Sequence, residues 1–257
     1  MGDNDLTFIE ACFSKYGMQN NGVIHVGAHY AQEAEFYHSI QSPYVLWIEG
    51  VSTVAEVART RIKKLGFSNQ DVVTAMISNL DSKDVDFYYA SNNGASSSLL
   101  RPRNHIAIHP EVKFTIGTTS TYTLNEIVKK FLLEKPKFLP PTILVLDLQG
   151  AEIAALEGYS RYLEEINFIV IEISVSKIYK KAPGLNDVNK FLEKKNFKLI
   201  SSKINSNFDY GDALFIRTQI NNSNFMSRLR SKSKGQLIRL FLIKLGLERI
   251  AKIATRR

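Results

Sequence analysis

Cysteine is nearly absent from this sequence. The single Cys12 excludes an internal disulfide, and it excludes a zinc site built from several cysteines. The N-terminal residues MGDNDLTFIEACF carry acids where a secretory signal carries basic residues, so we expect no signal peptide. Both features are typical of a protein that acts in the reducing cytoplasm.

Long hydrophobic runs are also lacking. No window reaches the roughly 20 consecutive apolar residues that a membrane-spanning helix needs. Apolar residues make up 44% and charged residues 23% of the 257 residues, which is ordinary for a globular protein. The sequence therefore predicts a folded domain without a membrane span.

Two phosphate-binding motifs are missing. There is no G-x-x-x-x-G-K-[ST] loop, and the first glycine loop, GAHYAQE (27–33), has one glycine where a dinucleotide site has G-x-G-x-x-G. Several glycines let the backbone approach a pyrophosphate closely. S-adenosylmethionine has no phosphate, so one glycine suffices for it, and the loop favours a methyl donor over NAD.

Positive charge is concentrated in the C-terminal tail. Residues 219–257 hold ten Lys or Arg and one acid, whereas residues 1–218 hold 23 and 24. We therefore expect a nearly neutral domain (1–218) followed by a basic amphipathic helical tail (219–257). Residues 234–253 mix apolar and basic residues, which fits a helix lying peripherally on an anionic membrane. The alternative is that this helix packs on its own domain or forms a homodimer.

Short apolar runs alternate with helical patterns along the domain. The runs that predict strands are 23–29, 44–50, 71–78, 84–91, 142–150, 168–174, 198–203 and 212–218, and the predicted helices are 31–40, 52–66, 123–134, 151–160 and 184–197. Runs such as ILVL and FIVI have no polar alternation, so both faces of their sheet should be covered. This order predicts an α/β fold with a doubly wound, mostly parallel sheet and an antiparallel strand near its end.

Sequence signals also indicate where two of the predicted helices begin or end. Ser52 is a plausible N-cap and Gly66 a C-terminal stop for one helix. Thr123 and Glu126 have the spacing of a capping box.

Functional residues are expected at the carboxyl ends of the strands, where open α/β sheets bind ligands. The residues found there are Gly27, Ala28, His29, Glu49, Ser78, Asn79, Asp147, Gln149 and Glu172. Glu49 lies 22 residues beyond Gly27, a spacing at which a carboxylate can accept both hydroxyls of an adenosine ribose. The alternative is a surface acid at a strand exit.

Several segments together resemble the FkbM-type methyltransferases. They are IHVGAHYAQE, WIEG, NNGASSSLL, LDLQGAEIAALEG and IVIEIS, within roughly residues 20–218. The resemblance implies the Rossmann-like class I methyltransferase fold and S-adenosylmethionine-dependent O-methylation of sugars, glycans or natural products. That family often has Asp in place of His25 and Gly in place of Ala31, and we interpret His25 as a tolerated core variant.

The resemblance also implies roles for individual residues. Gly27, Ala28 and His29 would line the methionine part of the cofactor. Glu49 would hold the ribose, and Ser78 and Asn79 would lie near the adenine. Asp147 and Gln149 would face the sulfonium and the acceptor.

An alcohol is a poor nucleophile while it is protonated, so a base or a metal should assist the transfer. Asp147 is the first candidate base, and the alternative is that it only positions the cofactor or caps the next helix. Glu172 is the second candidate. Asp147, Glu152 and Glu172 also offer oxygen ligands for Mg²⁺, but their spacing is not diagnostic, so metal dependence stays open.

The polar loop at 92–105 is the candidate acceptor site. Asn93, Ser96, Ser97, Ser98 and His105 supply donors and acceptors suited to sugar hydroxyls. The alternative is a polar turn that caps a helix beginning near Leu99, with His105 and His109 as ordinary loop histidines.

The hypothesis that follows is an O-methyltransferase acting on a sugar or glycan hydroxyl. The alternatives are an RNA-binding methyltransferase that uses the basic tail, methylation of a small natural product, and a partner protein that keeps the fold without a cofactor. The tail has only Phe225 and Phe241 for base stacking, which disfavours nucleic acid.

Overall fold

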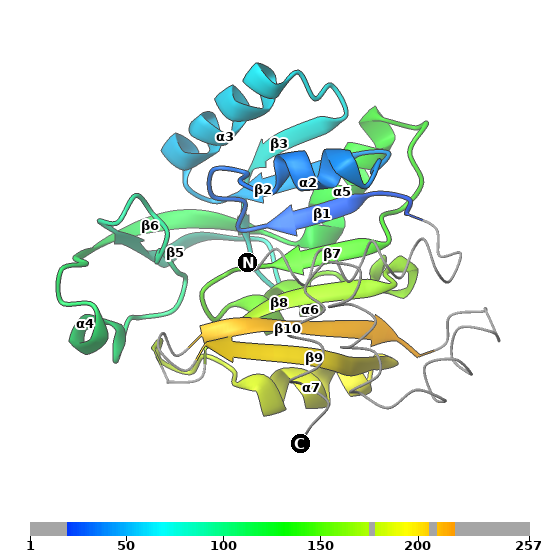
Figure 1. Cartoon of the computed structure of the whole chain (residues 1–257). Coiled ribbons are helices and arrows are strands. Elements are labelled where there is room, and N and C mark those ends of the chain that lie inside the picture. The colour runs from blue at the N-terminus through cyan, green and yellow to red at the C-terminus, as the bar shows by residue number, and fades with distance from the viewer. Residues whose placement is uncertain (1–19, 175–177, 206–209, 219–257) are drawn as a thin grey trace, which may run out of the picture. The chain divides into compact units, whose positions relative to one another are not determined.

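The central sheet has seven strands in the order β3-β2-β1-β7-β8-β10-β9 (Figure 1). The computed structural model describes residues 20–174, 178–205 and 210–218. The strands of this sheet are β1 (Val23–Val26), β2 (Val45–Glu49), β3 (Gln70–Thr74), β7 (Ile143–Leu146), β8 (Phe168–Ser174), β9 (Phe197–Asn205) and β10 (Tyr210–Arg217). The predicted tail, and with it the boundary near 218, concerns residues outside this description.

Most strand pairs are parallel, and one strand runs the other way. β1 pairs in parallel with β2 and β7, β2 with β3, and β7 with β8. β10 lies antiparallel between β8 and β9. The structure thus confirms the predicted mostly parallel α/β sheet and its antiparallel strand near the end.

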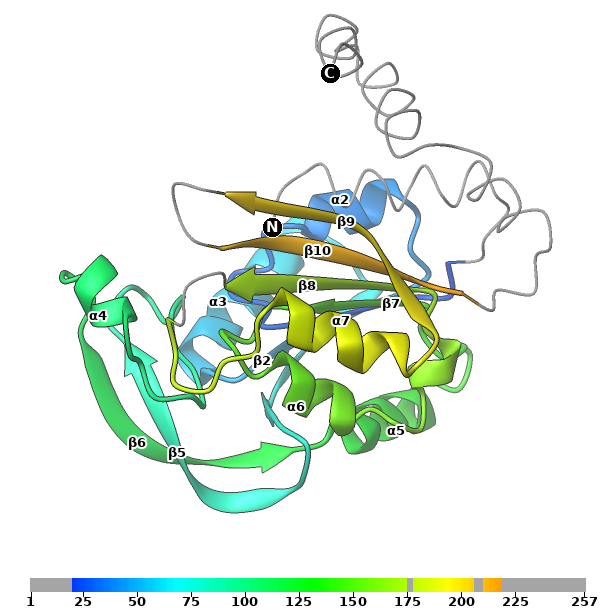
Figure 2. The ribbon, with the colours of Figure 1, turned by 90° about the horizontal axis from the view of Figure 1, so that it is seen from below.

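Helices cover the sheet on both faces. Figure 2 shows α5 (Leu124–Glu134), α6 (Glu152–Glu157) and α7 (Leu185–Glu193) together on one side. Alternate strand residues such as Ile24 and Leu144 pack against them in one core. On the other side, α2 (Ala34–Ser39) and α3 (Ser52–Leu65) cover β1 to β3, where Tyr37 contacts Trp47. This two-sided burial is why β1, β2 and β7 have no exposed residue.

The two predicted helix caps differ from the structure in detail. Ser52 is the first helical residue of α3 rather than its N-cap, which is Val51 without a side-chain cap. The N–H of Val51 instead donates to the carboxylate of Glu49 at 2.9 Å. Gly66 ends α3 in the left-handed conformation with φ +73°, as predicted.

The capping box of α5 is half formed. The Thr123 hydroxyl accepts from the N–H of Glu126 at 3.4 Å. The N–H of Thr123, however, donates to Asp81 at 2.7 Å rather than to the side chain of Glu126.

The predicted strand at 71–78 is two strands in two sheets. β3 ends at Thr74, and β4 (Met76–Ile77) pairs with β6 (Phe114–Tyr122), which in turn pairs with β5 (Ser82–Ala90). The break falls at Ala75, whose N–H donates to the carbonyl of Glu49 at 3.0 Å. β6 was not predicted, because only one of its nine residues is buried and the segment gives no apolar alternation.

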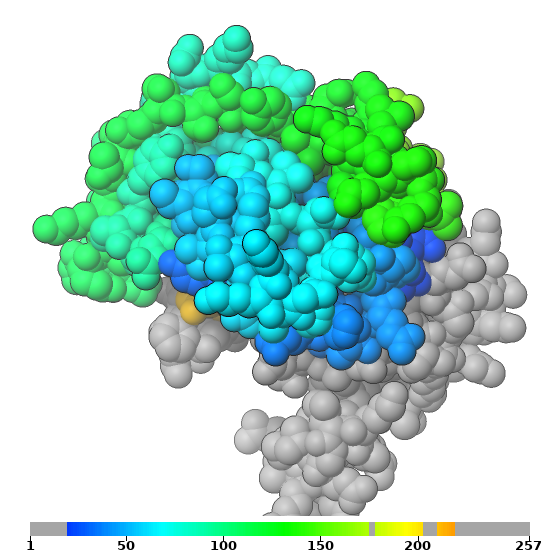
Figure 3. Space-filling model, turned by 90° about the horizontal axis from the view of Figure 1, so that it is seen from above, coloured from blue at the N-terminus to red at the C-terminus, as the bar shows by residue number. Residues whose placement is uncertain are grey.

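A long connection joins β5 to β6. It consists of turns at 91–96 and one short helix, α4 (His105–Ile108), so no helix begins near Leu99. Figure 3 shows the α3 segment, in cyan, forming the surface between the second sheet with its connection and the α5 segment.

Candidate active site

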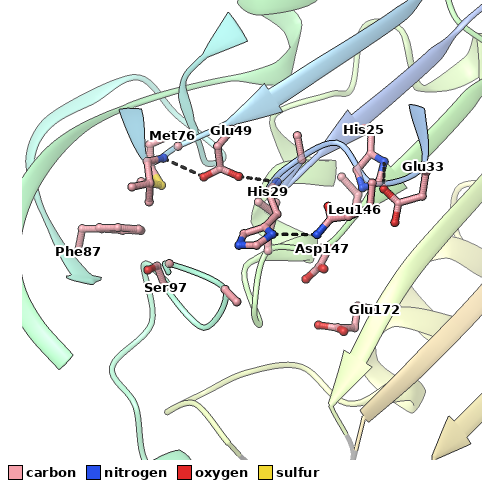
Figure 4. A pocket seen from close by; sticks show the side chains of 18 of the residues that line it. His25, His29, Glu33, Glu49, Met76, Phe87, Ser97, Leu146, Asp147 and Glu172 are labelled. Carbon is pink, nitrogen blue, oxygen red and sulfur yellow. Dashed lines mark hydrogen bonds and ion pairs between the residues drawn. The ribbon is translucent and has the colours of Figure 1, made fainter. Parts of the chain in front are cut away.

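A cavity opens where the chain reverses its winding direction. From β1 the chain builds β2 and β3 on one side, and it later adds β7 on the other side of β1. At this switch point, the carboxyl ends of β1, β2, β7 and β8 surround a cavity of about 390 Å³ (Figure 4). Its volume is within the range of small-molecule sites. It is lined by His25, Gly27, Ala28, His29, Gln32, Glu33, Glu49, Gly50, Val51, Met76, Phe87, Gly94, Ala95, Ser97, Leu146, Asp147, Leu148, Glu172 and Asp212.

Gly27 makes the turn out of β1. Its φ of +80° lies in the left-handed region, and a Cβ at this position would collide with the backbone carbonyl oxygen of Asp147. The N–H groups of Gly27 and Ala28 both donate to the carbonyl of Ile48, at 2.9 and 3.1 Å. The glycine therefore allows the ends of β1 and β7 to touch, and β2 holds the turn in place.

Glu49 is a buried carboxylate at the end of β2. It is 9% exposed, and its two oxygens accept the N–H groups of His29 at 2.8 Å and Val51 at 2.9 Å. Burial raises its pKa, and these backbone hydrogen bonds act against that rise. Each oxygen keeps a second lone pair, so the side chain can still accept hydroxyl donors.

His29 links the first loop to the polar loop. The amide nitrogen of Gln32 lies 3.0 Å from Nδ1, and the carbonyl oxygen of Asn93 lies 3.2 Å from Nε2. An amide nitrogen can only donate and a carbonyl can only accept, so Nδ1 accepts from Gln32 and Nε2 donates to Asn93.

Asp147 and Glu172 form a carboxylate pair bridged by Gln149. The Gln149 amide nitrogen donates to Asp147 at 2.8 Å and to Glu172 at 2.6 Å. Burial raises the pKa of Glu172 well above its usual range, and the charge of Asp147 and a hydrogen bond to it add to this rise. Glu172 therefore holds a proton under conditions where an ordinary glutamate is ionised.

Tyr179 lies beside the bridging amide. Its hydroxyl lies 2.7 Å from the carbonyl oxygen of Ser96 and 3.3 Å from Oε1 of Gln149. The other end of this amide, its nitrogen, faces the two carboxylates. Tyr179 was not predicted as a site residue, because it lies in a connection without periodicity.

Glu152 does not line the cavity, unlike Asp147 and Glu172. Its carboxylate accepts the N–H groups of Leu148 and Gly150, each at 3.0 Å, and burial raises its pKa to about 7. It holds the loop before α6, so the three candidate metal ligands Asp147, Glu152 and Glu172 do not converge on one point. Within the described residues, no three His, Cys, Asp or Glu side chains could hold a metal ion together.

His25 is buried at 3% exposed, in agreement with its interpretation as a core residue, and it also lines the cavity. Its Nδ1 lies 3.1 Å from the Tyr37 hydroxyl and 4.0 Å from the carboxylate of Glu33, and its ring stacks on Trp47. Burial lowers the pKa of His25, while Glu33 and Asp147 act in the opposite direction.

Ser78 and Asn79 do not line the cavity. The N–H of Ser78 donates to the carbonyl of Tyr122, and the Asn79 amide donates to Glu157 at 3.1 Å. The break at Ala75 takes the chain out of the central sheet before these residues are reached. Met76 and Phe87 line the cavity on this side instead.

The polar loop contributes fewer cavity residues than predicted. Of its predicted residues, Ser97 lines the cavity, and Asn93 borders a neighbouring hollow instead. Ser98 donates from its hydroxyl to the carbonyl of Gln149 at 2.9 Å, and Ser96 accepts from Tyr179. These two serines therefore anchor the loop.

His105 also lies away from the cavity lining. It is 4% exposed, and its ring packs among His109, Phe114 and Tyr179.

Asp212 is a cavity residue that the sequence did not reveal. It lies in β10, directly opposite Glu172 in the antiparallel register. Its position depends on which strand β10 pairs with, and that is a long-range property. Phe87 was missed for a similar reason, since β5 reaches the cavity through the second sheet.

A doubly wound sheet with a carboxylate-rich cavity at its switch point is the arrangement in which α/β proteins bind small ligands. The methyltransferase FkbM domain matches residues 25–199, so the chain belongs to the FkbM methyltransferase family. Within the described residues, no helix is long and apolar enough to cross a membrane.

Individual relatives are distant. The chain is 24% identical over 172 residues to the hexuronic acid methyltransferase AglP of Haloferax volcanii, covering 65% of this chain and 68% of that protein. The structure of an O-methyltransferase from Bacillus cereus in complex with SAH is 12% identical, with 84% and 82% of the chains covered and a TM-score of 0.48. The structure of M. capricolum TrmK with S-adenosyl-homocysteine is 9% identical, with 85% and 70% covered and a TM-score of 0.46.

Proposed function

We propose that this methyltransferase uses S-adenosylmethionine to O-methylate a hydroxyl of a sugar or glycan. The observation that carries the proposal is the cavity in which the Gly27 turn, Glu49 and the Asp147–Glu172 pair meet. Membership of the FkbM family supports methyl transfer. The name of the hexuronic acid methyltransferase relative supports a sugar acceptor.

The residues present fit this cofactor. Figure 4 shows Met76 and Phe87 on one side of Glu49, and Asp147 and Glu172 on the other. Glu49 would accept the ribose hydroxyls, and the apolar Met76 and Phe87 would flank the adenine in place of Ser78 and Asn79. Gly27, Ala28 and His29 would border the methionine part.

Catalysis would rest on alignment and on proton removal. S-adenosylmethionine supplies the methyl group and the positive charge of its sulfonium. Aligning the acceptor oxygen with the methyl group lowers much of the barrier. Asp147 or Glu172 would receive the hydroxyl proton, with Gln149 holding both carboxylates, while Ser97 and its loop would contact the acceptor.

The test of the acceptor class is transfer of a labelled methyl group from S-adenosylmethionine to a panel of acceptors. The panel contains simple glycosides, extracted glycans, RNA and a protein mixture. We expect label in methyl ethers of the carbohydrate fraction, identified by mass spectrometry after hydrolysis. Label confined to RNA or protein would contradict a sugar acceptor and leave the methyltransferase class intact.

Glu49 provides the test of the cofactor site. Glu49→Ala should weaken S-adenosylmethionine binding by about 1.5–3 kcal/mol, because charge-assisted hydrogen bonds to the ribose are lost. This corresponds to roughly a 10- to 150-fold rise in Kd, measurable by calorimetry. Glu157→Ala, which removes an exposed acid outside the cavity, is the control. Unchanged affinity in Glu49→Ala would rule out the ribose role.

The tail remains a separate prediction. Its membrane or homodimer contact concerns residues 219–257, and binding to liposomes with and without anionic lipid would distinguish the two. The predicted cytoplasmic location is likewise still a prediction.

A further inference from the structure

The carboxylate pair has a geometry that favours one shared proton. One amide nitrogen, on Gln149, donates to both Asp147 and Glu172 within 2.8 Å. Two carboxylates held this close repel each other when both are ionised, so one of them keeps its proton. Glu172 is the member that keeps it, because protonation also lets it hydrogen-bond to Asp147.

Other acids near the pair favour the same protonation state. Glu152 from α6 and Asp212 from β10 both act on Glu172 and favour its protonated form. The hydroxyls of Tyr179 and Tyr210 also face this group of acids. His25, from β1, is kept neutral by burial, so it does not offset the charge.

A cation entering the cavity would reverse this balance. An opposite charge beside a carboxyl group favours its ionised form, and the effect is strong in a partly buried site. Glu49 lies toward one end of the cavity, and Asp147 and Glu172 lie at the other end (Figure 4). If a nucleoside is held at Glu49, its sulfonium would lie beside Asp147 and Glu172.

We propose that the Asp147–Glu172 pair holds one proton before the cofactor binds and releases it to solvent when S-adenosylmethionine binds. This inference rests on the proposed cofactor. The ionised pair is then a base that is ready only when the methyl donor is present. During transfer, the acceptor's O–H proton passes to the pair as the C–O bond forms and the S–C bond breaks. The sulfur becomes neutral as the pair becomes protonated, so the charge of the site stays balanced.

The experiment is calorimetric titration of the full chain in two buffers of low and high ionisation enthalpy, at a pH above the pKa of about 7 of Glu152, so that this neighbour is already ionised. The difference between the two measured enthalpies gives the protons released on binding. We expect about one proton for S-adenosylmethionine and close to none for S-adenosylhomocysteine, which lacks the positive charge.

Variants of the pair make the assignment specific. In Glu172→Gln the release should fall to the level of S-adenosylhomocysteine, because the titrating group is gone. In Asp147→Asn it should also fall, because Glu172 then ionises more readily before the cofactor binds. Glu134→Gln, an exposed acid at the end of α5, should leave the release unchanged.

The outcomes separate this inference from the proposed function. Equal release for both ligands, or release that persists in Glu172→Gln and in Asp147→Asn, would overturn the inference while the cofactor assignment stands. Failure of S-adenosylmethionine to bind the unaltered chain would overturn both. If Glu172→Gln does not fold, Asp147→Asn and the comparison of the two ligands still decide the question.

Discussion

Replacing Asp147 with asparagine is expected to lower kcat by about 10²–10⁴-fold, the usual contribution of a general base. The change removes one negative charge from the carboxylate pair and keeps the shape of the side chain. Its Oδ1 can still accept from the Gln149 amide, so we expect the fold to persist. Turnover with a saturating acceptor, measured across pH, is the readout, and thermal unfolding checks the fold.

The pH profile of this variant carries additional information. Removing the negative neighbour lowers the pKa of Glu172, because Asp147 is among the causes that raise it. Any residual activity should therefore extend to lower pH than in the unaltered enzyme. Asp86→Asn, an exposed acid of β5, is the control. Near-normal turnover at every pH would show that Asp147 is not required as a base.

Replacing Gly27 with alanine is expected to destabilise the domain and abolish cofactor binding. An alanine at positive φ costs about 1–2 kcal/mol. Overlap of its Cβ with the carbonyl oxygen of Asp147 adds about 1–3 kcal/mol, because backbone atoms must move. Denaturant titration measures the loss of stability, and calorimetry measures the loss of binding.

Gly66→Ala is the matched control for this experiment. Gly66 also has a positive φ, of +73°, but no atom lies within 4 Å of an added Cβ. It should show the conformational cost alone, with normal binding. If Gly27→Ala were no worse than Gly66→Ala in both measurements, the close approach of β1 and β7 would not matter for the site.

The sequence predicted the central part of this site for a clear physical reason. Parallel strands end at the same edge of a sheet, so residues that follow different strands meet there. Gly27, Glu49, Asp147 and Glu172 all line the cavity on that basis. Their positions depend on local strand patterns, which a single sequence reveals.

Positions that depend on long-range pairing were not predictable. The apolar run at 71–78 gives no sign that Met76 leaves the sheet, because its new partner is Thr121, far away in the sequence. Ser78 and Asn79 were placed near the adenine for this reason. Asp212 was missed because its place opposite Glu172 requires the register of β10.

Two of the attachments of the polar loop use main-chain atoms of the loop. His29 lies within hydrogen-bond distance of the carbonyl of Asn93, and Tyr179 of the carbonyl of Ser96. A carbonyl group is present whatever side chain a residue carries, so a substitution at Ser96 keeps its attachment, whereas Asn93, at a φ of +56°, favours Asn, Asp or Gly. Loops anchored in this way can vary among relatives while the supporting scaffold is retained. Selection can therefore change the surface offered to an acceptor without rebuilding the donor site.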